Sequence, residues 1–466
     1  MLPVTVDRAA RRPLIALLVI AAIVGGWILW SRGGIGTDPG AGAIPGPSAG
    51  TGGVVASPIV TGLPSDGGSA ATGAAATAGP SPTSGPTPTA AASGPATPRP
   101  GAPSATQELT ALLDARLAQL RATTGIPGIS AAIVFADGSI WRGTDGLADV
   151  AARRSVTPDT EFSVASASKT FTAALILALV EDGRLSLDAT ARSYLADLPI
   201  DPAITVRELL DHTSGLRDFF YHPNIDHALL SKPARVWDAA RSLSFVRKPT
   251  TKPGAAWQYS NTNYLVLGLL AEAVGGAPVA DQLRDRFFVP LGLGHTVYQA
   301  SMRPTGPVAR GYRFTGSDPK LPAIDLSDGT DVVPFTSVVT AAGAAGSIAT
   351  SAGDLARWAA ALYGGDALSQ ASRDAMIADI ALTARFKPAV AYGLGVEAVK
   401  VAGWPTLGHA GRFLGARAVV RWLPDERIAI AVLTNQSRSD PNAVLADLLK
   451  LSLQPRPVCS GCSPSP

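Results

Sequence analysis

The sequence predicts an α+β fold, an α/β sandwich with one antiparallel sheet of about five strands flanked by helices and joined to a mostly helical lobe. Three observations carry this prediction. Two strand patterns open the folded region, a long stretch of helical patterns follows, and strand patterns return only near its end. The simplest assembly pairs the early and late strands in one sheet and places the first and last helices on one face. A functional site would then lie in the groove beside the helical lobe.

The apolar periodicity sets the bounds of the single elements. A first helix is predicted over residues 106–122, where leucines recur on one side, and Gly125 ends it. Strands are predicted over residues 129–135 and 139–143, and Asp137-Gly138 between them is a strong hairpin signal. The late strands are expected at residues 392–399, 416–423 and 427–434, and further helices at residues 204–210, 262–274, 278–287, 352–362 and 443–453.

Composition divides the chain into four parts. Residues 1–30 hold a short basic stub and an uninterrupted apolar segment, residues 14–30, long enough to cross a bilayer as a signal-anchor helix. A cleaved secretory signal is the alternative, and both place the rest of the chain outside the cytoplasm. Residues 31–103 are almost entirely Gly, Ala, Pro, Ser and Thr, a composition typical of a disordered linker. The folded domain is expected at residues 104–455, followed by a flexible tail at residues 456–466.

Charge and cysteine content argue against several classes of function. The net charge is only +3 and the basic residues look scattered, so nothing points to nucleic acid. Cys459 and Cys462 are the only cysteines and both lie in the tail, where a local disulfide is expected in an oxidising compartment. His222, Asp226 and His227 form too sparse a pattern to predict a metal site. We expect neither a metal nor a cofactor.

A serine and a lysine three residues apart stand at the start of an apolar helical pattern. The run at residues 171–180 predicts a helix that ends at Gly183, and a start near Ser166 places Lys169 one turn on, on the same face. A serine needs a neighbouring base to become a nucleophile, and a desolvated lysine can serve. Alone, the pair is also typical of a capping serine with a surface lysine. Residues 317–320 repeat the spacing, but with a proline in a polar loop.

Two further motifs lie downstream. Tyr259-Ser260-Asn261 precedes a predicted helix and, in isolation, is typical of a turn with a capping asparagine. His409-Ala410-Gly411 precedes the strand predicted at residues 416–423, and its glycine would let a substrate backbone approach the edge of the sheet.

With these three motifs in this order, the chain resembles the serine β-lactamase and penicillin-binding-protein superfamily, in the branch of class C β-lactamases and D-alanyl-D-alanine carboxypeptidases. The resemblance covers about residues 107–453 and implies the β-lactamase/transpeptidase-like fold. Further segments similar to those of the family are residues 209–216, 290–293, 350–355 and 392–395.

The resemblance also implies a mechanism, acyl transfer through a covalent ester on Ser166. Lys169 and Tyr259 would share the general-base and proton-relay work. A neutral lysine beside a neutral tyrosine and a charged lysine beside a tyrosinate are both workable. The oxyanion hole would be the backbone N–H of Ser166 and that of Arg412. The residues implied in substrate binding are Asn261, which would bond the amide side chain of the substrate, His409, Gly411 and Arg412.

The chain departs from the β-lactamase pattern at the third motif. Class C β-lactamases have Lys-Thr-Gly where this sequence has His409-Ala410-Gly411, so a permanent cation and a hydroxyl that help to hold a β-lactam carboxylate are missing. A histidine there resembles some carboxypeptidase members. Arg412 or Arg417 would supply the missing positive charge.

The predicted function is therefore an extracytoplasmic serine hydrolase that acts on a peptide or small molecule, with a D-alanyl-D-alanine cell-wall peptide as the first expectation. The alternatives are an esterase or a β-lactamase of the same superfamily, and a non-catalytic sensor of cell-wall fragments. The membrane is the other expected partner, through residues 14–30.

Overall fold

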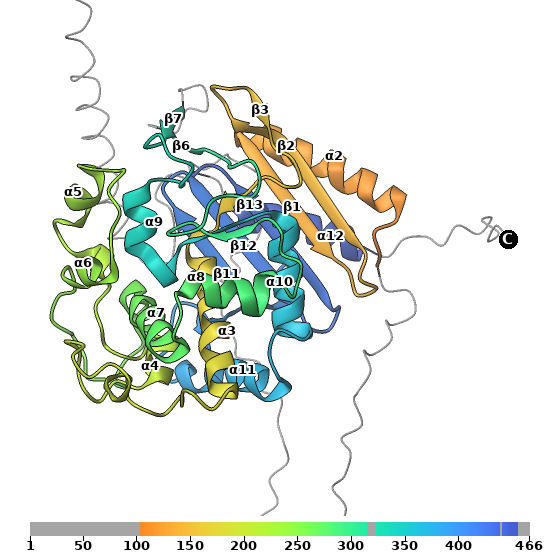
Figure 1. The fold of residues 1–466 in the computed structure, drawn as a ribbon. Helices are drawn as coiled ribbons and strands as arrows, with labels where there is room; N and C mark the ends of the chain where they lie inside the picture. Colours follow the sequence, from red (N-terminus) through yellow and green to blue (C-terminus); the bar gives the residue numbers. More distant parts are fainter. Residues whose placement is uncertain (1–102, 315–322, 439, 455–466) are drawn as a thin grey trace, which may run out of the picture.

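The computed structural model describes residues 103–314, 323–438 and 440–454 (Figure 1). The predicted signal anchor, the linker up to residue 102, the Ser317 repeat and both cysteines lie outside these residues. Within them, no single helix is long and apolar enough to cross a membrane. One pair of helices, Asn261–Gly275 and Val279–Phe288, passes that test only in combination and is bent by 79°.

An eight-stranded sheet lies at the centre of the described domain, with every neighbouring pair antiparallel and the strand order β3-β2-β1-β13-β12-β11-β10-β9. As predicted, the early hairpin pairs with the late strands, through β1 and β13. The strands are β1 (Gly128–Val134), β2 (Ile140–Asp149), β3 (Arg154–Ser155), β9 (Ala391–Tyr392), β10 (Glu397–Val401), β11 (Trp404–Phe413), β12 (Ala416–Leu423) and β13 (Ile428–Thr434).

The prediction of about five strands was too low. The pattern at residues 392–399 is interrupted by a turn at Gly395, whose φ is 74°, and divides into β9 and β10. The sequence does not predict β11, because Pro405, Gly408 and Gly411 interrupt its apolar alternation. β3 is only two residues long and pairs with the end of β2.

Helices cover both faces of the sheet (Figure 1). The helices at residues 107–124, 168–181, 261–275, 352–364 and 441–453 agree with predicted ones to within a few residues, whereas the long helix at residues 370–384 was not predicted. Thr106 caps the first by accepting a hydrogen bond from the Leu109 N–H at 3.2 Å. The α-helices are α2 (Gln107–Thr124), α3 (Ser168–Glu181), α4 (Val206–Leu210), α5 (Ile225–Leu230), α6 (Ala239–Leu243), α7 (Asn261–Gly275), α8 (Val279–Leu283), α9 (Thr336–Ala342), α10 (Ala352–Gly364), α11 (Gln370–Ala384) and α12 (Pro441–Leu453).

Strand β13 explains how the two faces are filled. Ile428, Ile430 and Val432 belong to the hydrophobic cluster that includes α2 and α12. Ala429 and Ala431 alternate with them and belong to the cluster that includes α3 and α10. The small alanines let α10 lie close to the sheet, and the first and last helices share one face, as predicted.

The helical lobe is also confirmed, and it carries its own hydrophobic cluster from α5, α7, α9 and the end of β11. The described residues also form two small sheets outside the main one. Their strands are β4 (Phe162–Ser163), β8 (Ile348–Thr350) and β5 (Thr296–Tyr298) in one, and β6 (Gly311–Phe314) and β7 (Ala323–Leu326) in the other.

Candidate active site

Ser166 lies in a tight turn between β4 and α3. After β4, the Val164 N–H donates to the Ile348 carbonyl at 3.0 Å, and a short 3-10 helix, Ala165–Ala167, leads directly into α3. Ala165 has a φ of 47°, in the left-handed region that is unfavourable for alanine. Ser166 stays partly exposed although its neighbours are buried. The strained turn therefore holds the hydroxyl at the start of the helix, within two residues of the predicted start.

Lys169 is fully buried and its amine contacts three oxygen atoms. Its Nζ lies 3.2 Å from the Ser166 Oγ, and it donates to the Asn261 Oδ1 at 2.7 Å and to the Ala345 carbonyl at 2.9 Å. A neutral amine has two N–H donors and one lone pair. The amide and the carbonyl take the two donors, which leaves the lone pair for the Ser166 hydroxyl.

The charge state of Lys169 is set mainly by its surroundings. Burial lowers the pKa of the amine to about 7, although the carboxylates of Asp218 and Glu397 act in the opposite direction. The amine also lies 5.0 Å from the centre of the Tyr259 ring and 5.4 Å from that of Tyr264. A substantial neutral fraction is therefore present at physiological pH.

Tyr259 completes the group around the serine. Burial raises the pKa of its phenol well above 10, and a hydrogen bond with the Ser166 side chain only partly opposes this shift. A tyrosinate is thus disfavoured, and of the two charge states open to the sequence prediction the structure favours neutral Lys169 with neutral Tyr259.

Asn261 and Asp218 hold Lys169 from the helical lobe. Asn261 is the first residue of α7, and both its backbone N–H and its Nδ2 donate to the Asp218 Oδ2, at 3.1 Å and 2.6 Å. The side chain expected to bind substrate is therefore bonded at both ends by the protein itself. The sequence prediction missed Asp218, because a contact between residues so far apart leaves no local pattern.

His212 is a second residue that the sequence prediction did not place at the site. Its ring is buried 4.4 Å from that of Tyr259, and its Nδ1 accepts from the Ser260 N–H at 3.2 Å. Its φ is 68°, a conformation that a non-glycine residue rarely adopts without a constraint. Burial lowers the ring's pKa well below 6.5, so a neutral imidazole packs against Tyr259.

The third motif lies within β11 and precedes β12, the strand predicted at residues 416–423, but Gly411 contacts the backbone of the protein itself, where a substrate backbone was expected. A Cβ at Gly411 would lie 1.9 Å from the carbonyl oxygen of Val164. The glycine thus admits the backbone of the nucleophile turn, not that of a substrate, and fixes the distance between β11 and Ser166.

Arg412 follows on the same strand. The Ala410 N–H donates to the Glu397 Oε2 at 3.1 Å, and N–H groups two residues apart on a strand point to the same side. The Arg412 N–H therefore points to the same edge, beyond the last β10–β11 pair, Glu397 with Gly408. The charge of Arg412 lowers the pKa of the Tyr221 phenol in the helical lobe, although burial and Asp218 raise it overall.

His409 does not present its ring to a substrate in this structure. The ring is 1% exposed, its Nε2 lies 3.0 Å from the Tyr392 hydroxyl and its Nδ1 lies 2.6 Å from the Ala410 carbonyl. Burial lowers the pKa of the imidazole, although Glu397 opposes this shift. The position that holds a permanent cation in the Lys-Thr-Gly pattern thus holds a buried, mainly neutral ring.

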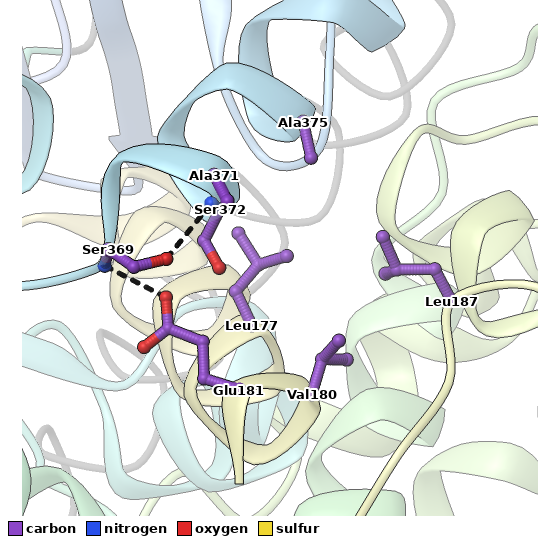
Figure 2. Close-up of a pocket in the computed structure, with 8 residues that line it drawn as sticks. All are labelled: Leu177, Val180, Glu181, Leu187, Ser369, Ala371, Ser372 and Ala375. Atoms are coloured by element: carbon purple, nitrogen blue, oxygen red, sulfur yellow. Dashed lines mark hydrogen bonds between the residues drawn. The ribbon is translucent and has the colours of Figure 1, made fainter. Parts of the chain in front are cut away.

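Other parts of the described chain carry no comparable chemistry. A hollow of about 510 Å³ between α3 and α11 is lined mostly by aliphatic side chains, and Glu181 at its rim accepts from the Ser369 N–H at 2.8 Å (Figure 2). It contains none of the predicted site residues. No group of three or more His, Cys, Asp or Glu among the described residues is arranged to hold a metal ion.

A strained serine before a buried helix, a desolvated lysine one turn on and a tyrosine at the same hydroxyl define a serine hydrolase of the penicillin-binding type. The chain belongs to the Beta-lactamase family, whose model matches residues 113–454. The family resemblance and the β-lactamase/transpeptidase-like fold expected from the sequence are both confirmed.

Individual relatives agree with this assignment. Penicillin-binding protein 4 of Amycolatopsis lactamdurans is 29% identical over 343 residues, which cover 69% of this chain and 84% of that protein. Penicillin-binding protein 4* of Bacillus subtilis (strain 168) is 28% identical over 242 residues, 51% of this chain and 52% of that protein, so the match spans about half of that relative. The crystal structure of a D-stereospecific amidohydrolase from Streptomyces sp. is similar with a TM-score of 0.62 and 26% identity, over 75% of this chain and 98% of that chain.

Proposed function

We propose that the protein is an extracytoplasmic hydrolase that forms an acyl-enzyme on Ser166 and acts, like a D-alanyl-D-alanine carboxypeptidase, on cell-wall peptides. The single observation that carries the chemistry is the arrangement at Lys169. Asn261 and Ala345 accept hydrogen bonds from its two N–H donors. The lone pair of the neutral amine is left for the Ser166 hydroxyl, whose oxygen lies 3.2 Å away.

The side chains at the site and one water molecule account for every proton transfer in the proposed reaction. The Lys169 amine takes the hydroxyl proton as the Ser166 oxygen attacks the carbonyl carbon, and the negative charge collects on the carbonyl oxygen. The backbone N–H groups of Ser166 and Arg412 stabilise that oxygen. Tyr259 passes the proton to the leaving nitrogen as the amide bond breaks. A water molecule then cleaves the ester by the reverse proton transfers.

Two considerations support the substrate class. The Streptomyces relative is named for action on amides of D configuration, and the apolar segment at residues 14–30 would place the domain outside the membrane, where cell-wall peptides occur. The β-lactamase alternative is weaker, because the buried His409 does not offer a carboxylate the cation that Lys-Thr-Gly provides.

The experiment is a kinetic panel on the full chain, with a D-alanyl-D-alanine peptide, a D-amino acid amide, a nitrophenyl ester and a cephalosporin. We expect the highest kcat/KM for the two D-configured substrates and none for Ser166→Ala. A cephalosporin preferred over both would assign the chain to the β-lactamases, and an ester turned over alone would make it an esterase.

A further inference from the structure

Basic residues are concentrated in one segment of this chain, although the net charge of the whole chain is low. Between residues 232 and 252 there are six basic residues and a single acid, a net charge of +5, whereas the whole chain carries +3. The single acid, Asp238, accepts a hydrogen bond from the Arg241 N–H at the start of α6. The basic residues are Lys232, Arg235, Arg241, Arg247, Lys248 and Lys252.

Part of this segment forms a groove of about 590 Å³, here called the cationic groove, lined by Arg217, Val246, Arg247, Lys248, Pro249 and Thr250. None of its three basic side chains forms an ion pair within the described residues. The Nε of Arg217 is shielded from solvent and has no hydrogen-bond partner there. A buried donor without a partner is costly, which favours an acceptor bound beside Arg217.

The cationic groove adjoins the active site on the side of Asn261. Arg217 directly precedes Asp218, whose carboxylate bonds the Asn261 side chain at 2.6 Å. At the other end, Thr250 lies 3.2 Å from the Gln258 side chain, and Gln258 directly precedes Tyr259. One end of the groove therefore directly precedes the partner of Asn261, and the other end is bonded to the residue that directly precedes Tyr259.

We propose that the cationic groove binds a carboxylate on the acyl half of the substrate, the half that is transferred to Ser166. This inference rests on the proposed function, in which the acyl half is bonded to Ser166, and the groove adjoins that residue on the side of Asn261. Guanidinium groups bind carboxylates through paired N–H donors, and the exposed Arg247 and Lys248 add long-range attraction. The groove thus selects acidic acyl groups over neutral ones of the same shape.

The test compares two esters that differ in one charge. The 4-nitrophenyl half-ester of adipic acid carries a carboxylate on the acyl half, and the 4-nitrophenyl ester of adipamic acid carries a carboxamide in its place. We expect a kcat/KM ratio of about two- to fivefold in favour of the acid for the full wild-type chain, in the range of exposed ion pairs. The ratio should fall as salt is raised to 1 M, where the screening length is about 3 Å.

The double variant R247A/K248A should bring the ratio close to one, and R247E/K248E should invert it. The matched control K400A/K450A removes two exposed cations from β10 and α12 and should keep the wild-type ratio. Equal kcat/KM values in the wild type, or an equal loss in the control, would overturn the proposal.

A binding measurement separates this inference from the proposed function. The full Ser166→Ala chain should bind adipamate more tightly than the uncharged adipamide in calorimetry, and R247A/K248A in that background should remove the difference. Adipamate binding no tighter than that of adipamide overturns the cationic groove. If neither ester is turned over while adipamate still binds preferentially, the acyl-enzyme mechanism fails and the groove stands.

Discussion

At Lys169, burial and the neighbouring carboxylates act on the amine in opposite directions. Burial is the larger effect and lowers the pKa from 10.5 to about 7, while Asp218 and Glu397 raise it. Since the unfolded chain keeps this proton to about pH 10.5, the cost of burying the ammonium is fully present below pH 7. It falls as the pH rises from 7 to 10.5. Burial of Lys169 thus lowers the stability of the folded chain at neutral pH, and it also lowers the pKa of the amine so that it can act as a base.

This electrostatic arrangement predicts a pH profile. The rate of Ser166 acylation by a fluorophosphonate should rise with pH, with a midpoint near 7, as Lys169 loses its proton. Glu397→Gln removes a negative charge that raises the Lys169 pKa, so the midpoint should move to lower pH. Labelling time courses between pH 5 and 9 measure both. The exposed Asp425→Asn serves as the control and should keep the midpoint; a Glu397→Gln midpoint that stays or rises would contradict the assignment of Lys169 as the base.

Among the secondary-structure elements, β11 is the one that sets the geometry of the site. It brings Gly411 against the carbonyl of Val164, two residues before the nucleophile, and places His409 in a buried network with Tyr392 and Glu397. His409, which replaces the lysine of the Lys-Thr-Gly pattern, is therefore buried within the protein. The strand holds the nucleophile turn by backbone contact and leaves charge selection to residues outside the motif.

A substitution at Gly411 tests this role. In Gly411→Ala the new Cβ would meet backbone at 1.9 Å, so the strand or the nucleophile turn must move. We expect a loss of about 1–3 kcal/mol in the free energy of unfolding, measured with urea, and slower labelling of Ser166. Gly294→Ala is the matched control, because its Cβ meets nothing within 4 Å and its φ is not positive. If the two variants behave alike, β11 does not position the turn.

At the scale of the whole molecule, the sequence predicts the layers better than the connections between them. Strong periodicity identifies α2, α3, β12 and β13, and the hairpin signal at Asp137-Gly138 identifies the start of the sheet. β11 is invisible to such patterns because a glycine required for a close backbone contact interrupts its alternation.

The residues of the candidate site also divide into those that local sequence patterns predict and those that only the folded chain brings together. Ser166 and Lys169 are predictable because they share one helix turn, and Tyr259 and Asn261 because they form a second local motif. Asp218 and His212 are not, since their roles arise only when α7 packs beside the segment that carries them. The cationic groove was missed for a related reason, because a low net charge for the whole chain concealed a local excess.

The reactivity of Ser166 belongs to the assembled molecule, because the three hydrogen-bond partners of its base, Lys169, come from three separate segments of the chain. The most direct measurement is fluorophosphonate labelling of the full chain, with the adduct mapped by mass spectrometry. We expect one adduct, on Ser166, that is absent from Ser166→Ala and from wild-type chain unfolded in urea. A folded chain that takes no adduct, or takes it on another serine, would contradict the assignment of Ser166 as the nucleophile.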